Sequence, residues 1–307
     1  MNNTVFNNFI INSSIELKPM LRISPFNEEY MGIPSNSLHQ AEQYLNTRFQ
    51  KYILTTKGRE AIDLALSYYK LKKDDVVTIL TSSNNFYISS CVTKVIEKHC
   101  LWSRKISNKT KVIFINHEFG YPYPNLSAIK KYNLPIIEDC AQSFMSNDKD
   151  ETIGNIGDFV VYSLPKFFPM QIGGILKINK RNIDIPSQLD SLHKHYILSH
   201  LSEYISSINK ICQKRLANYN YLKDNLSSLG IEPFFRYTQG IVPGVFLFKW
   251  HSNINYPLLK EFMQTNGVES SVFYGQNAFF VPVHHNLSNL HLDYIISLIK
   301  YFYNDLL

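Results

Sequence analysis

The chain has 307 residues, of which 45% are hydrophobic and 18% are charged, and its formal net charge is +6 at pH 7. This balance is typical of a globular protein with a sizeable core, and it excludes a chain that is disordered over most of its length. The basic residues form no block long enough for a nucleic-acid-binding arm, because the lysine-rich run at 70–75 ends in two aspartates. We therefore expect no nucleic-acid partner.

The distribution of cysteines and of apolar residues indicates in which cellular compartment we expect the protein. The four cysteines are scattered and form no C-x-x-C pair, so neither a zinc site nor a redox pair is predicted. A reduced, cytoplasmic protein is the simpler interpretation. The first residues lack the basic segment and long apolar core of a signal peptide, and no run approaches the ~20 apolar residues that span a bilayer. We expect no membrane partner.

The chain begins with an Asn- and Ser-rich stretch, residues 1–35, which we interpret as an irregular arm with a short strand. Beyond it, short apolar runs of the kind buried on both faces of a parallel sheet occur at 75–83, 111–117 and 134–139. Helical spacing of apolar residues is found at 37–50, from Gly58 onward, at 86–99 and at 126–132. Strands and helices alternate four times, which favours an α/β fold with a mostly parallel sheet between helices.

The pattern changes after Ile178. Residues 188–228 are helical, and the remainder predicts strands at 244–250 and 268–275 and helices at 257–267 and 292–307. We therefore predict an N-terminal arm (1–35), a large α/β domain (36–210) and a small C-terminal α+β domain (211–307).

Polar residues follow the ends of the predicted strands. In open α/β sheets, ligands bind outside the carboxyl ends of the strands. Five groups of side chains are therefore expected to converge on one site: Gly58-Arg59, Asn84-Asn85-Phe86, His117, Asp139 with Gln142, and Ser163 with Lys166.

An acid and a lysine are the most informative members of this set. Lys166 lies between a proline and two phenylalanines, and we expect it to be buried, because desolvation lowers the pKa of an amine as a Schiff-base lysine requires. Asp139 ends an Ile-rich strand, where a carboxylate can face the pyridinium nitrogen of pyridoxal 5'-phosphate (PLP). Gln142 can face the phenolic oxygen of the same ring. The alternatives are a snorkelling surface lysine and a helix N-cap aspartate.

The remaining candidates each have a structural alternative. Gly58 and Arg59 open a helix after a strand, an arrangement that binds phosphate, but an ordinary turn with a surface arginine has the same sequence. Ser163 offers a hydroxyl to the same phosphate. Phe86 can stack on a flat ring or simply pack in the core, and His117 can contact a substrate or be a hydrogen-bonded core histidine.

Two histidine pairs raise the question of a metal site. The pairs His284-His285 and His193-x-His195 have no acidic or Cys/His cluster at ligand spacing nearby. We therefore predict no metal ligands in this chain.

Four motifs in order resemble the DegT/DnrJ/StrS family of PLP-dependent (nucleotide-)sugar aminotransferases, from about Ala41 to Ile178. TTKGREAIDLAL is similar to the segment that holds the cofactor phosphate, and FINHEFGYPYPNLSAI is similar to a His-x-x-Gly strand and turn. LPIIEDCAQSF is similar to the motif Glu-Asp-x-Ala-Gln, and GNIGDFVVYSLPKFFPMQIGG is similar to Gly-Asp-x-x-x-x-Ser…Lys…Gly-Gly.

The resemblance implies an aspartate-aminotransferase-like fold (PLP-dependent transferase fold type I) and a homodimer with the active site at the subunit interface. It implies transfer of an amino group from glutamate to a keto-deoxysugar carried on a nucleotide, for a surface glycan such as an O-antigen. Lys166 would form the Schiff base and carry the proton, with Asp139 at the pyridinium nitrogen, Gln142 near the ring oxygen, Phe86 on the ring, and Gly58, Arg59 and Ser163 at the phosphate.

The sequence departs from the family pattern at several points. Arg59 stands where a threonine is usual, and Ser163 precedes Lys166 by three residues instead of five. The family usually has an Asn/Arg-bearing segment after the lysine that reaches into the partner's site, and we do not recognise it in the short stretch 180–210. Two alternatives remain. One is an altered paralogue that only binds a nucleotide sugar or a partner subunit. The other is a PLP-dependent sugar dehydratase, against which Lys166 argues because those relatives carry histidine at that position.

Overall fold

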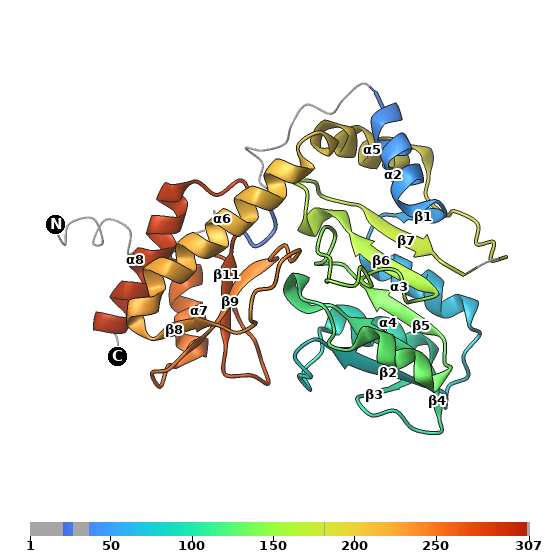
Figure 1. The fold of residues 1–307 in the computed structure, drawn as a ribbon, viewed down its shortest axis with the longest axis horizontal. Helices are drawn as coiled ribbons and strands as arrows, with labels where there is room; N and C mark the ends of the chain where they lie inside the picture. Colours follow the sequence, from blue (N-terminus) through green and yellow to red (C-terminus); the bar gives the residue numbers. More distant parts are fainter. Residues whose placement is uncertain (1–20, 27–36, 181, 306–307) are drawn as a thin grey trace.

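The computed structural model describes residues 21–26, 37–180 and 182–305. Most of the predicted arm at 1–35 lies outside these ranges. Two sheets lie side by side, and one long helix, α6 (Ile208–Leu226), runs from the first to the second (Figure 1). Among the described residues, no helix combines the length and the apolar composition needed to cross a bilayer.

The first sheet has seven strands in the order β1-β7-β6-β5-β4-β2-β3. The pairs from β3 through β2, β4 and β5 to β6 are parallel, and β7 is antiparallel to both β1 and β6. The predicted mostly parallel sheet is confirmed. Its strands are β1 (Tyr52–Thr55), β2 (Val76–Thr81), β3 (Leu101–Ser103), β4 (Thr110–Asn116), β5 (Ile136–Asp139), β6 (Phe159–Ser163) and β7 (Gly174–Ile178).

Helices cover both faces of this sheet. The helices α3 (Gly58–Tyr68) and α4 (Ser90–His99) pack on one face, and α2 (His39–Phe49) and α5 (Ser191–Ile205) pack on the other (Figure 1). The helix predicted at 86–99 begins later, at Ser90, because the Ser89 hydroxyl accepts a hydrogen bond from the Cys91 N–H and caps it there. The helix predicted at 126–132 is the 3-10 helix η3 (Leu126–Tyr132).

The second sheet is antiparallel, with strand order β10-β11-β9-β8. Its strands are β8 (Ile231–Pro233), β9 (Val245–Trp250), β10 (Ser271–Val272) and β11 (Phe279–Pro282). The helices α6, α7 (Tyr256–Thr265) and α8 (Asn289–Asp305) cover one face, where Phe246, Phe248 and Phe279 are fully buried. Such burial stabilises each side chain by roughly 1.5–3 kcal/mol.

Helix α6 contributes to both cores. Ile208 and Ile211 belong to the hydrophobic cluster under α2 and α5, whereas Tyr219, Leu222 and Leu226 belong to the cluster over the second sheet. The predicted domain division between residues 210 and 211 stays a prediction. We propose that the boundary lies within α6 itself, between its first turns and Tyr219.

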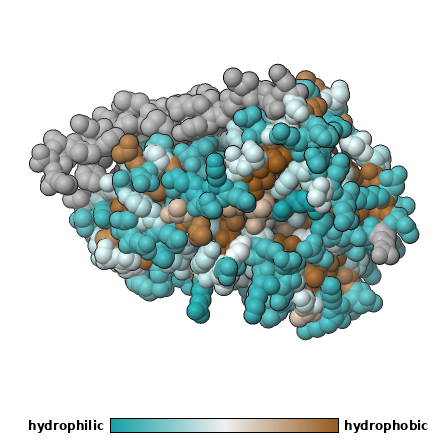
Figure 2. All heavy atoms as spheres, turned by 45° about the horizontal axis from the view of Figure 1, so that its top comes forward, coloured by the Kyte–Doolittle hydropathy of each residue, from teal (hydrophilic) through white to brown (hydrophobic). Residues whose placement is uncertain are grey.

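The molecular surface is mostly hydrophilic on the face in Figure 2, with hydrophobic side chains gathered in separate groups, the most prominent of them near the middle. Several large apolar side chains are strongly exposed in the single chain, including Phe86 and Leu192, each 75% exposed. Single exposed apolar side chains are normal on a protein surface, whereas a contiguous apolar patch indicates a surface that another molecule covers.

The buried His284 and the partly buried His285 predict that the fold is sensitive to acid. Burial and the charges of Arg215 and His285 lower the pKa of His284 to about 3, and burial and Arg215 lower the pKa of His285 to about 3. The ordinary value is about 6.5. Between these values the unfolded chain binds more protons than the folded chain, so the free energy of unfolding decreases as the pH falls through this window.

We expect each histidine to contribute a loss of about 2 kcal/mol between pH 6.5 and pH 5. Urea unfolding measured at pH 7, 6 and 5 checks this, with His285→Asn flattening the pH dependence. His251→Asn, which changes an exposed histidine, serves as the control. A pH profile that His285→Asn and His251→Asn change equally contradicts the prediction.

Candidate active site

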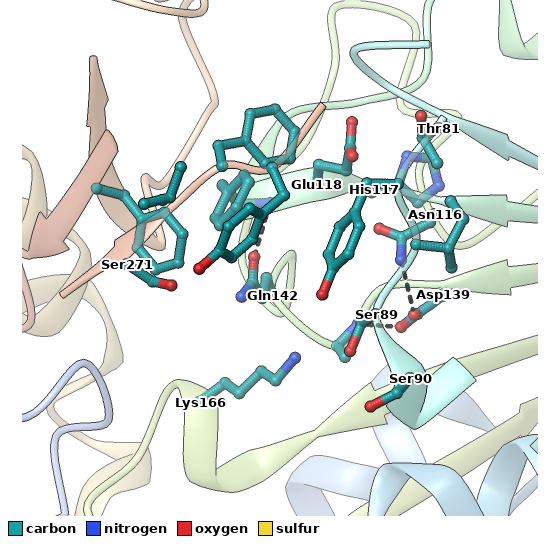
Figure 3. Close-up of a pocket in the computed structure, with 18 residues that line it drawn as sticks. Thr81, Ser89, Ser90, Asn116, His117, Glu118, Asp139, Gln142, Lys166 and Ser271 are labelled. Carbon is teal, nitrogen blue, oxygen red and sulfur yellow. Dashed lines mark hydrogen bonds between the residues drawn. The ribbon is translucent and has the colours of Figure 1, made fainter. Parts of the chain in front are cut away.

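A pocket of about 310 Å³ lies at the carboxyl ends of β2, β4 and β5. The start of α4, the 3-10 turn η4 (Leu164–Lys166) and the β10–β11 region of the second sheet complete its wall (Figure 3). Four of the predicted site residues line it: His117, Asp139, Gln142 and Lys166. The pocket therefore joins residues from three separate motifs.

Asp139, the last residue of β5, is a buried acid with 6% of its surface exposed. Its carboxylate accepts hydrogen bonds from the Asn116 side-chain amide (3.2 Å) and from the Ala141 backbone N–H (3.0 Å). Burial raises the pKa of Asp139, and the nearby charge of Lys166 opposes that rise. Among the described residues, no cation forms an ion pair with this carboxylate. The acid is therefore available to a positively charged group in the pocket.

Lys166 ends η4, directly after β6. Its amine is directed into the pocket between Ser271 on one side and Ser89 and Asp139 on the other (Figure 3). The side chain is exposed in the single chain, so the expectation of a buried lysine is wrong. The neighbouring Phe167 and Phe168 are buried, but the 3-10 turn aims Lys166 away from their core and into the open pocket.

Gln142 is tied to the neighbouring loop. Its side-chain oxygen accepts a hydrogen bond from the Phe119 N–H at 2.7 Å. Phe119 lies in the 3-10 turn η2 (Glu118–Gly120) with φ of 55°, in the left-handed region that costs a non-glycine residue on the order of 1 kcal/mol. Its ring packs edge-on against Phe273 of the second sheet, with centroids 5.2 Å apart. The bond to Phe119 leaves the Gln142 NH₂ group as the donor that can face a ligand.

His117 lines the pocket but its side chain is a bonded core group. The ring Nε2 lies 3.1 Å from the Glu138 carboxylate, and Nδ1 accepts from the Tyr123 N–H at 3.1 Å. Both side chains of the His117–Glu138 pair are fully buried. This geometry favours the structural alternative for His117, and its contact with a substrate remains a prediction.

Glu138, His117 and Cys140 place three potential metal-ligand atoms within 4.8 Å of one another. The Glu138 carboxylate also accepts hydrogen bonds from the Gly154, Ile156 and Gly157 N–H groups. Burial by itself raises the pKa of Glu138, but the bonds from His117 and the backbone outweigh it and hold the pKa below its ordinary value. The oxygens are thus occupied by N–H donors that fix the 154–157 loop, which explains the cluster without a metal.

The residues predicted at the phosphate lie beside this pocket and are not part of its lining. A Cβ on Gly58 would lie 3.4 Å from the Ser163 Cβ, so the start of α3 and the end of β6 are in contact. Arg59 is exposed and its guanidinium reaches the Cys91 sulfur at 3.8 Å, in the first turn of α4. The N-cap residue Lys57 makes no side-chain cap, and the Glu60 carboxylate in the first turn of α3 accepts from the Thr56 N–H and hydroxyl. These roles remain predictions.

Phe86 is not brought to the pocket. It is 75% exposed, whereas the next residue, Tyr87, lines the pocket and packs against Tyr274 with ring centroids 5.5 Å apart. The chain bends at Phe86 before α4 begins at Ser90, and the four residues that follow the bend, 87–90, line the pocket. In the single chain, the predicted aromatic position is therefore occupied by Tyr87.

Several lining residues escaped the sequence analysis. Asn116 ends β4 one position before His117, and the pleat of the strand gives a signal for it. Glu118 is a second buried acid whose pKa is raised by burial. The other missed residues are Thr81, Tyr87, Ile88, Ser89, Ser90, Phe119, Ala141, Ser271, Val272, Phe273, Tyr274 and Phe280. The last five come from the β10–β11 region of the second sheet, and no local sequence signal places them here.

These residues fit PLP. The pocket contains the buried Asp139 carboxylate, which accepts hydrogen bonds from uncharged N–H groups of the described residues. It also contains the Lys166 amine, and the start of α3, which has no side-chain cap from its N-cap residue, lies next to it. This is the donor set that the pyridinium nitrogen, the aldehyde and the phosphate of the cofactor require.

Sequence comparison finds a family match in the part of the chain that contains Asp139, Gln142 and Lys166. Residues 91–176 match the model of the DegT/DnrJ/EryC1/StrS aminotransferase family. A GDP-perosamine synthase of Escherichia coli O157:H7 is 34% identical over 137 residues, which is 42% of this chain. The match spans only 36% of that relative, little more than a third of its length.

Solved structures of aminotransferases share the fold. A putative sugar aminotransferase from Streptococcus pneumoniae, in its PLP-form, superposes with a TM-score of 0.72 over 95% of this chain and 99% of that chain, at 15% identity. A DegT DnrJ EryC1 StrS aminotransferase from Brucella abortus has a TM-score of 0.67 over 90% and 93% of the two chains, at 16% identity. The predicted resemblance is confirmed: the chain carries the signature of the DegT/DnrJ/EryC1/StrS aminotransferase family at residues 91–176, on a fold that it shares with aminotransferases of that family.

Proposed function

We propose that the protein is a PLP-dependent aminotransferase that moves an amino group from glutamate to a keto-deoxysugar linked to a nucleotide. The observation that carries this proposal is the pairing of Asp139 and Lys166 in one pocket at the carboxyl ends of the parallel strands. The family signature and the relative named for an amino sugar support the substrate class. The use of such a product in a surface glycan, for example an O-antigen, belongs to the same proposal.

When bound, the cofactor supplies a conjugated ring that withdraws electrons from the amino-bearing carbon of the substrate. Lys166 holds the cofactor through Nζ and moves the substrate proton with the same atom. Asp139 keeps a proton on the ring nitrogen, because a buried carboxylate without a cationic partner favours a positive charge beside it. The Gln142 amide orients the ring oxygen, and Gly58, Arg59 and Ser163 hold the phosphate.

A homodimer with the pocket at the subunit interface is part of this proposal. Phe86 is 75% exposed and Tyr87 is 50% exposed beside the pocket, and a second copy of the chain would cover such aromatic groups. In a dimer, Phe86 would have a packing partner that the single chain does not offer. Covering the pocket would also remove water from Lys166.

A visible spectrum of the purified protein with PLP tests the proposal. We expect a yellow band that is lost when glutamate is added and returns when a keto-deoxysugar nucleotide follows. GDP-, UDP- and dTDP-linked keto-deoxysugars form the substrate panel, and D-glutamate is the control donor. A protein that stays colourless with excess PLP contradicts the proposal, as does a band that L-glutamate and D-glutamate bleach equally.

A further inference from the structure

Arg215 on α6 is a buried cation without a carboxylate. It is 1% exposed, and none of the ion pairs among the described residues includes it. Burial lowers its pKa to about 10. Its neighbours include His284 and His285, whose own pKa values the positive charge of Arg215 helps to lower. A charge in such surroundings is costly to bury unless hydrogen bonds satisfy its N–H groups.

The hydrogen bonds of Arg215 end on the turn that carries Lys166. Its Nη2 donates to the Lys166 carbonyl at 2.8 Å and to the Phe167 carbonyl at 3.2 Å. The guanidinium carbon also lies 5.0 Å from the centre of the Phe167 ring, within range of a cation–π contact. The last carbonyls of a helical turn have no partner within the turn. Arg215 donates hydrogen bonds to these carbonyls and thereby caps the end of η4 from another part of the chain.

Other contacts connect the same turn to the C-terminal part of the chain. Ser24 donates through its hydroxyl to the Pro165 carbonyl at 2.7 Å, and His284 bonds the Arg22 carbonyl at 2.9 Å. One turn beyond Arg215, the buried Asn218 donates to the His284 carbonyl at 2.9 Å. Two adjacent turns of α6 therefore hold two different loops: Arg215 holds the lysine turn, and Asn218 holds the connection after β11.

We propose that Arg215 is a positioning residue that fixes the backbone of the lysine turn so that the Lys166 amine enters the pocket beside Asp139. This inference rests on the proposed role of Lys166. The lysine side chain has four flexible carbons, so the backbone at its root decides where the amine can reach. A displacement of about 1 Å in a reacting group can cost on the order of a hundredfold in rate.

Hydrogen exchange measures the positioning without any cofactor. The Phe167 and Phe168 amides donate to the Leu164 carbonyl within the turn, and their exchange reports its opening. We expect Arg215→Met to speed exchange in residues 164–170 at least fivefold, and Arg215→Lys to restore part of the protection. The matched control is Asn218→Leu, equally buried on the same helix, which should speed exchange around His284 and leave the lysine turn unchanged. Equal exchange of the lysine turn in Arg215→Met and Asn218→Leu overturns the proposal.

Covalent attachment of PLP measures whether the Lys166 amine is correctly positioned in each variant. In each variant, the amount of PLP bound after dialysis is compared with the amount fixed to Lys166 by borohydride reduction. For Arg215→Met we expect bound PLP to fall little and the reducible fraction to fall at least fivefold, with rescue by Arg215→Lys and no change in Asn218→Leu. An unchanged reducible fraction overturns the proposal. If the wild-type protein itself binds no PLP, the proposed function fails, and the exchange experiment alone decides the role of Arg215.

Discussion

Replacing Lys166 with alanine is expected to reduce the rate of amino transfer by at least about 10⁴-fold, because the proposed function makes this side chain both the nucleophile and the proton carrier. The amine lies in the pocket with Asp139, and among the described residues no other lysine lines it. The variant should fold as the wild type does, since an exposed side chain contributes little to stability. It should still bind PLP non-covalently through the phosphate. Single-turnover kinetics with glutamate and the visible band measure both consequences.

The control is Lys94→Ala, which removes an exposed lysine from α4 outside the pocket and should leave rate and spectrum unchanged. Added methylamine sharpens the test, because a small amine that enters the space left by Lys166 can carry the proton. Partial recovery by methylamine in Lys166→Ala, and none in Lys94→Ala, supports proton transfer by this residue. Turnover of Lys166→Ala within tenfold of the wild type shows that the lysine assignment is wrong.

The first sheet was predictable because most of its strands have a recognisable local sequence pattern. The runs that became β2, β4 and β5 each contain consecutive Val, Ile, Leu or Phe residues, as expected of strands whose two faces are both covered. The edge strand β3 was missed, since Leu101–Ser103 is only three residues long and partly exposed and needs no apolar signature. The start of α4 was misplaced by four residues, because helical spacing cannot show where a serine cap ends the extended chain.

The residues of the candidate site likewise include some that a local sequence pattern identifies and others that it does not. Asp139 and Lys166 were found because each stands at the end of a strand, where position in the chain fixes position in the sheet. The burial of Lys166 was predicted wrongly, since apolar neighbours in sequence say nothing about the direction of a side chain after a 3-10 turn. Phe273 directly follows β10 and Phe280 lies in β11, and the packing of Phe119 against them, together with that of Tyr87 against Tyr274, brings this part of the chain to the pocket. Contacts of this kind depend on tertiary structure and leave no local pattern.

Asp139→Asn is expected to lower kcat by roughly 10²–10⁴-fold with little change in the amount of PLP bound. Removing one partner of a buried charge pair costs about 3–5 kcal/mol, and each 1.36 kcal/mol is tenfold in rate. The change is nearly isosteric, and the amide oxygen of the new side chain can still accept from the Ala141 N–H, as the Asp139 carboxylate does at 3.0 Å. What is lost is the negative charge that, in the proposed function, keeps a proton on the ring nitrogen. The measurements are kcat and KM for glutamate together with the PLP content.

The neighbouring Glu138→Gln is the matched control, because Glu138 is an equally buried acid on the same strand that bonds His117 and the 154–157 loop. Its NH₂ group would face N–H donors, so we expect a lower melting temperature. The depressed pKa of Glu138 means that its stabilisation is present above the unfolded value of about 4.3 and is lost as the pH falls through the folded value. At neutral pH, kcat per folded molecule should be unchanged. Equal losses of kcat in the two variants would mean that Asp139 only supports the fold, whereas a loss confined to Asp139→Asn assigns the charge at the ring nitrogen to this residue.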